Sequence, residues 1–181
     1  MKQSHSPIAL LMKEHDVIQS ARQVIDALDN LWVKDDAAYR GKVEELINFF
    51  RIYSDKFHHE KEETILFRQL KDHPDFRLHD LIDELEEHHE NFRLQVKGIE
   101  QELAKMNWTL VQKLLLEYTD ALADHIAVEN DELFVMTEML FSEEELSRMY
   151  FLFEDLDSLI GLNKKTELEH FVNDSSTVDG N

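Results

Sequence analysis

The sequence predicts an all-α protein: a four-helix bundle of up-down-up-down topology with an additional C-terminal helix. Only four Gly and two Pro occur in 181 residues, so the chain has little of the punctuation that connects β-strands. Apolar residues recur at the three- and four-residue spacing of amphipathic helices along most of the chain. The length suits one domain with a substantial core.

The first two predicted helices follow from their start signals. Ser6 is a favourable N-cap and Pro7 is tolerated in the first helical turn, so the first helix begins there and continues to about Trp32. The acidic pair Asp35-Asp36 opens a second helix, which continues to about Leu70. The segment His73-Pro74-Asp75 then breaks the helical pattern.

Two further helices complete the predicted bundle. Helical spacing of apolar residues predicts a third helix over about residues 78–103 and a fourth over residues 110–140. Asn107 marks the turn between them. Because short turns join long helices, neighbours are expected to be antiparallel, which gives the up-down-up-down topology.

Beyond the bundle, Ser142 and Glu145 have the spacing of a capping box. They predict a fifth helix, laid across the bundle, that continues to Gly161, where glycine suits a C-terminal cap. One or two more turns are expected within residues 164–172, and residues 173–181 are expected to be a disordered tail. We therefore expect a single domain over residues 1–172, with the bundle at about 7–140 and the extra helix at about 142–161.

Composition excludes several classes of function. Lys and Arg number 19 against 39 Asp and Glu, and this net charge of −20 disfavours nucleic acid and anionic membranes as partners. The absence of Cys excludes disulfides, thiolate metal ligands and thiol nucleophiles. No signal peptide and no membrane span are recognisable, so a cytoplasmic location is expected. Any metal must be bound by imidazole and carboxylate.

The motif that points to chemistry is a repeated H-x-x-x-E-x-x-x-L-F. One copy begins at His58 in the second predicted helix and the other at His125 in the fourth, and their glutamates are Glu62 and Glu129. Residues four apart lie on one face of an α-helix, so each copy directs an imidazole and a carboxylate the same way. His58 is favoured over the adjacent His59 because only His58 fits the register of the other copy.

The first and third helices form a second repeat, centred on His15 and His89. Around both histidines, apolar residues stand at offsets −7, −4, +3 and +10. His88 is the alternative to His89. Its neighbours at the same offsets form a poor apolar stripe, but Glu87-His88 matches the dipeptide Glu14-His15.

Residue counts from the predicted turns place the four histidines at one level of the bundle. Two buried carboxylates in the same layer call for cations, because unpaired buried charges are costly. The sequence therefore predicts a two-metal site in the core with these ligands: His15, His58, Glu62, His89, His125 and Glu129. The other histidines have no such partners and are expected at the surface, with His88 kept as the alternative above: His5, His59, His73, His79 and His170.

These residues resemble the hemerythrin-like, HHE cation-binding domain family. The resemblance rests on Glu14-His15, on H-x-x-K-E-E-x-x-L-F at 58–67 and on H-x-x-x-E-x-x-x-L-F at 125–134, and it covers about residues 7–140. It implies a di-iron centre with two imidazoles on each iron and an oxo bridge, in which Glu62 and Glu129 are the bridging carboxylates. Zinc or manganese are substitutes that an N,O ligand set accepts.

Within that family, four histidines and two glutamates are more similar to proteins that repair iron centres after nitrosative or oxidative stress than to oxygen carriers. The oxygen carriers have a fifth histidine, and here Leu85 and Arg93 occupy the positions one turn from His89. The resemblance implies a non-haem di-iron protein that reacts with O₂, NO or peroxide, in sensing, scavenging or iron delivery, by oxidation rather than reversible oxygen binding. An iron-storage module without turnover and an oxygen-carrying bacteriohemerythrin are the alternatives, and a monomer or a homodimer is expected.

Overall fold

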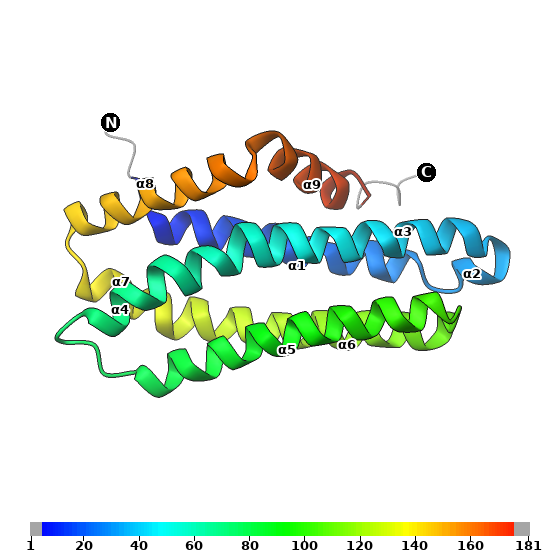
Figure 1. Cartoon of the computed structure of the whole chain (residues 1–181), viewed down its shortest axis with the longest axis horizontal. Coiled ribbons are helices and arrows are strands. Elements are labelled where there is room, and N and C mark those ends of the chain that lie inside the picture. Colours follow the sequence, from blue (N-terminus) through cyan, green and yellow to red (C-terminus); the bar gives the residue numbers. More distant parts are fainter. Residues whose placement is uncertain (1–4, 176–181) are drawn as a thin grey trace.

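Four long helical rods form the bundle in the computed structural model, which describes residues 5–175 (Figure 1). The first rod is α1 (Pro7–Ala27), and the second consists of α3 (Asp36–Phe49), η1 (Phe50–His59), η2 (Glu62–Leu66) and α4 (Phe67–Asp72). The third rod is α5 (His79–Ala104). The fourth consists of α6 (Trp108–Val128), η3 (Glu129–Leu133) and α7 (Phe134–Leu140). Helix α1 packs against α6, α6 against α5, α5 against α3 and η1, and η1 against α1. The described residues contain no strand, and the predicted all-α bundle is confirmed.

The helix ends follow the capping signals, with one exception. The Ser6 side chain accepts a hydrogen bond from the Ala9 amide at 3.0 Å, and that of Asp35 accepts from the Ala38 amide at 2.8 Å. The prediction that the first helix continues to residue 32 is wrong, because α1 ends at Ala27. Asn30 adopts a left-handed conformation (φ 59°), which asparagine tolerates, and a separate short helix, α2 (Leu31–Lys34), follows.

Three stretches of the second and fourth rods are wound as π-helix, which the sequence analysis did not predict. Segments η2 and η3 each begin at the glutamate of the repeated motif and end at its leucine. Segment η1 covers the ten residues up to and including His58 and His59. Such windings are rare and are frequent at functional sites, so their position on both motif copies directs attention to these residues.

Helices α8 (Glu143–Ile160) and α9 (Leu162–Ser175) lie over the side of the bundle formed by α1 and η1 (Figure 1). The capping box of Ser142 and Glu145 is present, and Gly161 caps the C-terminus of α8 with a φ of 120°, a value that favours glycine. Helix α9 is longer than the one or two turns predicted and includes residues 173–175 of the expected tail. The rest of that expected tail, residues 176–181, lies outside the described residues.

The apolar core consists of two clusters with a polar layer between them. In α1, Leu11 belongs to one cluster and Ile18 to the other, and His15 lies between them. In α5, His89 lies in the same way between Leu85 and Phe92. The histidines thus occupy one level of the bundle, as their sequence positions predict. Among residues 5–175, no helix combines the length and apolar character needed to span a membrane.

Candidate metal centre

All six predicted ligands lie in the polar layer, and a seventh residue joins them. Each is at most 3% exposed: His15, His58, His59, Glu62, His89, His125 and Glu129. Helix α1 supplies the first, the second rod supplies the next three, α5 supplies one, and the fourth rod supplies the last two. The four rods therefore all contribute to one buried cluster of imidazoles and carboxylates.

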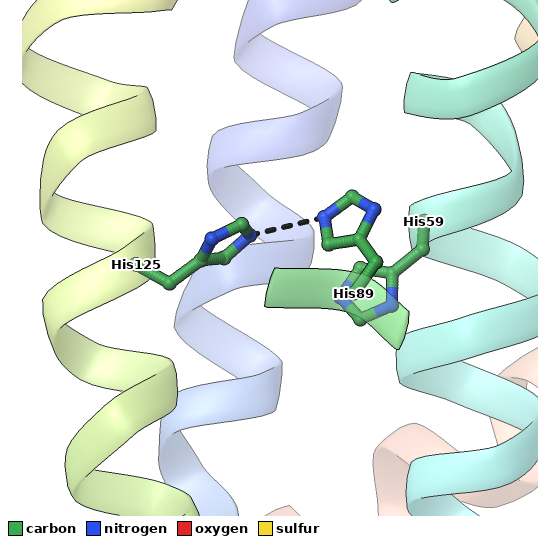
Figure 2. Close-up of side chains that lie close together, drawn as sticks. All are labelled: His59, His89 and His125. Carbon is green, nitrogen blue, oxygen red and sulfur yellow. Dashed lines mark hydrogen bonds between the residues drawn. The ribbon is translucent and has the colours of Figure 1, made fainter. Parts of the chain in front are cut away.

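The seven side chains form two groups. His15, His58, Glu62 and Glu129 have potential ligand atoms that all lie within 4.8 Å of one another. A second group meets the same limit and consists of the three histidines His59, His89 and His125 (Figure 2). The Nε2 atoms of His89 and His125 are 3.0 Å apart, and the rings of His59 and His89 are stacked with centroids 3.9 Å apart. We call these the two-histidine side and the three-histidine side.

Each carboxylate faces both sides of the cluster. In Glu129, Oε2 lies 3.2 Å from His15 Nε2 and Oε1 lies 3.3 Å from His125 Nε2. In Glu62, Oε2 lies 3.4 Å from His58 Nε2 and 3.6 Å from His89 Nε2. Carboxylates placed between two groups of imidazoles have the arrangement that bridging two cations requires.

The outward nitrogens of the rings are held by other side chains. His58 Nδ1 donates to Glu14 Oε2 at 3.1 Å, and His89 Nδ1 donates to Glu63 Oε1 at 2.8 Å. His15 Nδ1 lies 2.9 Å from Asn130 Oδ1 and has the same relation to that acceptor. A proton on Nδ1 leaves Nε2 with a free lone pair, which is how an acceptor behind a histidine orients it as a metal ligand.

This pattern leaves acceptors facing acceptors inside the cluster. The lone pair of His15 Nε2 and a carboxylate oxygen of Glu129 lie 3.2 Å apart, where they repel each other unless a proton or a metal cation lies between them. Among the described residues, both oxygens of Glu62 and of Glu129 and the Nε2 of His15 are buried without a hydrogen-bond partner. Buried polar atoms are normally satisfied. These residues therefore fit bound cations, and imidazole with carboxylate is a donor set for transition metals.

Burial sets the protonation of the cluster in its metal-free form. It lowers the pKa of His58, His59 and His89 below the ordinary value of 6.5, so these rings are neutral near pH 7. Burial and the charge of Glu129 raise the pKa of Glu62 well above 4.5. Burial also opposes ionisation of Glu129, but in the metal-free form charge interactions with His125 and His15 and hydrogen bonds from their rings outweigh it and hold the pKa of that carboxyl well below 4.5. Neutral rings and an ionised carboxylate are the forms that bind metal.

The comparison with protein families agrees with this geometry. The model of the hemerythrin HHE cation binding domain matches residues 6–137. The chain belongs to the hemerythrin HHE family. No curated protein and no solved structure matches it. Membership identifies a cation-binding domain, and the buried histidines and glutamates of this HHE domain are compatible with that role. Helices α8 and α9 lie beyond the matched residues.

His59 is the residue of this HHE domain that the sequence analysis missed. The expectation that it lies at the surface is wrong: His59 is 2% exposed and belongs to the three-histidine side. In an α-helix, adjacent residues are separated by about 100°, so His58 and His59 would point to different faces. The π-helical winding of η1 has more residues per turn, which reduces that angle and brings both rings to the cluster. The lack of a fifth histidine was the reason to separate this chain from the oxygen carriers, and the buried His59 removes that reason.

The remaining histidines are placed largely as expected. His89 is fully buried, whereas the side chain of His88 is 39% exposed. His88 nonetheless lies behind a predicted ligand, because its Nδ1 is 3.3 Å from His125 Nδ1. The other four lie outside the buried cluster and are exposed or half-buried: His5, His73, His79 and His170.

Acid is expected to destabilise the metal-free HHE domain. As the pH falls from 6.5 to 5, the unfolded chain protonates His58, His59 and His89 more readily than the folded chain does, because their folded pKa values are lowered. The raised pKa of Glu62 works the other way and gives the folded state one extra proton above pH 4.5. Three histidines outweigh one carboxyl, so the free energy of unfolding is expected to fall as the pH is lowered from 6.5 to 5.

Urea unfolding of metal-free protein across this pH range measures the effect. The carboxyls with lowered pKa values, such as Glu129, lose their stabilising contribution only below about pH 4.5 and do not disturb this window. A free energy of unfolding that stays constant or increases from pH 6.5 to 5 would contradict neutral buried histidines.

Proposed function

We propose that this HHE domain is a non-haem di-iron protein that reacts with O₂, NO or peroxide. The observation that carries the proposal is the division of five buried histidines into two groups on either side of two carboxylates. One iron would be held by His15 and His58 and the other by His59, His89 and His125. Glu62 and Glu129 would be shared. Two irons in such a set would supply binding and redox chemistry toward small diatomic molecules or peroxide.

The two halves of the proposed site are unequal. If both carboxylates are shared, the three-histidine side offers five protein donors and the two-histidine side offers four. Iron in an N,O ligand set commonly takes about six donors. A small exogenous molecule therefore finds more room at the two-histidine side. This inequality favours the binding of a diatomic ligand over simple storage, which needs no such difference between the two metal positions.

Two pockets reach the cluster at its three-histidine side, so a small molecule that enters there would have to pass the shared carboxylates to reach the two-histidine side. One has a volume of about 360 Å³ and reaches His59, and the other has a volume of about 590 Å³ and reaches His125. Aromatic and aliphatic side chains form much of the wall of the smaller pocket: Phe50, Ile52, Phe92, Val96 and Tyr118. Four charged residues, Arg51, Asp55, Lys56 and Arg93, also line this pocket, so the apolar part of its wall is the part that favours O₂ or NO over bulk water and ions.

The test is the optical and electron paramagnetic resonance response of the iron-loaded, anaerobically reduced protein to O₂ and to NO. We expect a spectral change with both gases in the wild type. The His59→Ala variant removes a donor from the three-histidine side and is expected to alter these spectra. His79→Ala is the matched control, because it also removes a histidine, but an exposed one at the start of α5.

Each outcome decides between functions. Release of O₂ on evacuation over several cycles would assign oxygen carriage, and oxidation that needs a reductant to reverse would assign scavenging or sensing. Iron-loaded protein that responds to neither gas would contradict the proposal and favour storage. A protein that binds no iron at all would contradict it at an earlier step.

A further inference from the structure

The strongest buried polar feature outside the proposed ligands is a cluster of two carboxylates and two lysines. We call it the lysine–carboxylate cluster, and its members are Glu14, Lys61, Asp157 and Lys165. The first lies in α1, the second between η1 and η2, the third in α8 and the last in α9. Lys61 is 0% exposed and Asp157 is 4% exposed. Buried charges require partners, and the four formal charges of this cluster sum to zero.

Each lysine of the cluster contacts both carboxylates. Lys61 Nζ donates to Glu14 Oε1 at 2.8 Å and also pairs with Asp157. Lys165 Nζ donates to Asp157 Oδ2 at 2.5 Å and also pairs with Glu14. Glu14 is thereby held between two ammonium groups, one of which comes from a helix beyond the residues matched by the family model.

The lysine–carboxylate cluster is hydrogen-bonded to a proposed metal ligand, His58. The second oxygen of Glu14, Oε2, accepts the hydrogen bond from His58 Nδ1 at 3.1 Å. The other two histidines with such an acceptor are held differently. Behind His15 stands the neutral amide of Asn130, and behind His89 stands Glu63, which Arg93 binds at 2.7 Å from within the bundle. Within residues 5–175, the C-terminal helices therefore act on the orienting hydrogen bond of His58 and not on those of His15 or His89.

We propose that α8 and α9 are a functional part of the metal centre, in which Asp157 and Lys165 are positioning residues that hold Glu14 and, through it, orient His58. This inference rests on the proposed function. Two lysines on one carboxylate fix its position and withdraw negative charge from it. Without Lys165, Glu14 is less constrained and becomes a stronger acceptor for the His58 proton. Both changes act on the two-histidine side and leave the three-histidine side in place. Loss of a group that orients a metal ligand typically weakens metal binding about 10- to 100-fold.

The experiment is an anaerobic Fe²⁺ titration of the metal-free full-length protein, combined with the reduction potential of the loaded form. For Lys165→Met, we expect one of two binding steps to weaken about 10- to 100-fold and the potential to shift, while the other step changes little. Lys165→Arg keeps the cation and is expected to restore both readouts. Lys164→Met is the matched control, because the neighbouring Lys164 pairs with the exposed Glu167 and lies outside the lysine–carboxylate cluster.

The outcomes separate a positioning role from a general effect on folding. Equal weakening of both binding steps would indicate loosening of the whole bundle and would overturn the inference. The inference would also be overturned if neither the binding steps nor the reduction potential changed. If Lys165→Met does not fold, as judged by circular dichroism, Asp157→Asn tests the same contact with a nearly isosteric side chain. Wild-type protein that takes up no Fe²⁺ would overturn the proposed function itself, whereas normal wild-type uptake with an unaffected Lys165→Met variant overturns only this inference.

Discussion

Protein produced in iron-rich medium is expected to carry about two metal ions per chain, and the variant with both His58→Ala and His125→Ala is expected to carry almost none. The two substitutions remove one imidazole from each side of the cluster and also break both i, i+4 pairs with the glutamates. Each glutamate then loses an imidazole whose Nε2 lies within 3.4 Å of it. Metal analysis of the purified proteins by mass spectrometry measures the result.

A matched double variant shows whether the loss is specific. His79→Ala with His170→Ala also removes two histidines from two helices, but both are exposed and lie outside the cluster. It is expected to keep the wild-type metal content. A wild-type value near zero or one metal ion, or equal losses in both double variants, would count against the shared pair of metals.

Removal of the metals is expected to lower the melting temperature of the protein by roughly 5–10 °C. A ligand present at about 100 times its Kd stabilises the folded state by about 2.7 kcal/mol, and each kcal/mol corresponds to about 2–4 °C in a protein of this size. The structural reason is the layer of facing acceptors, which a cation satisfies and an empty site does not. Calorimetry of metal-loaded and chelator-treated protein at neutral pH measures the difference.

The variant Glu62→Gln tests the same explanation from the opposite direction. An amide keeps the shape of the side chain, removes a charge that burial and Glu129 disfavour, and supplies a donor for the lone pair of His58 or of His89. Metal-free Glu62→Gln is therefore expected to melt at a higher temperature than metal-free wild type, and to gain less on addition of metal. Equal melting temperatures of loaded and metal-free wild type would be incompatible with this explanation.

Most of the fold could be predicted from the sequence because its signals are local. Ser6-Pro7, the capping box at Ser142 and the glycine at 161 each act within one helical turn, and the structure confirms all three. The early end of α1 could not be predicted, because asparagine at position 30 does not by itself require the left-handed conformation that it adopts here.

The candidate site was predictable where it repeats and unpredictable where the helix geometry changes. The two motif copies place four residues, and the structure brings them together with His15 and His89. Selecting one residue of a histidine pair assumes α-helical angles, so the same rule that correctly favours the buried His89 over His88 wrongly rejects His59 in η1. The doublet His58-His59 beside a glutamate motif was the available signal, but only the winding decides it.

The partners that surround the site could not be predicted for a different reason. The contact between Lys165 and Glu14 joins residues far apart in the chain, on helices that meet only in the folded protein. No periodicity or spacing relates such residues. From the sequence alone, Lys165 and Glu14 could equally be ordinary charged residues at the surface, because the chain has 39 acidic residues.

The polar layer divides the apolar interior into two clusters at opposite ends of the bundle. Each end has its own aliphatic and aromatic contacts, so each has its own source of stability. Cooperative unfolding needs favourable contacts that join the two ends, and in this chain the continuous rods and the metal layer provide them. Metal occupancy therefore governs whether the two ends open together or separately: amide protons at both ends share one free energy of exchange when the layer is filled and differ when it is empty.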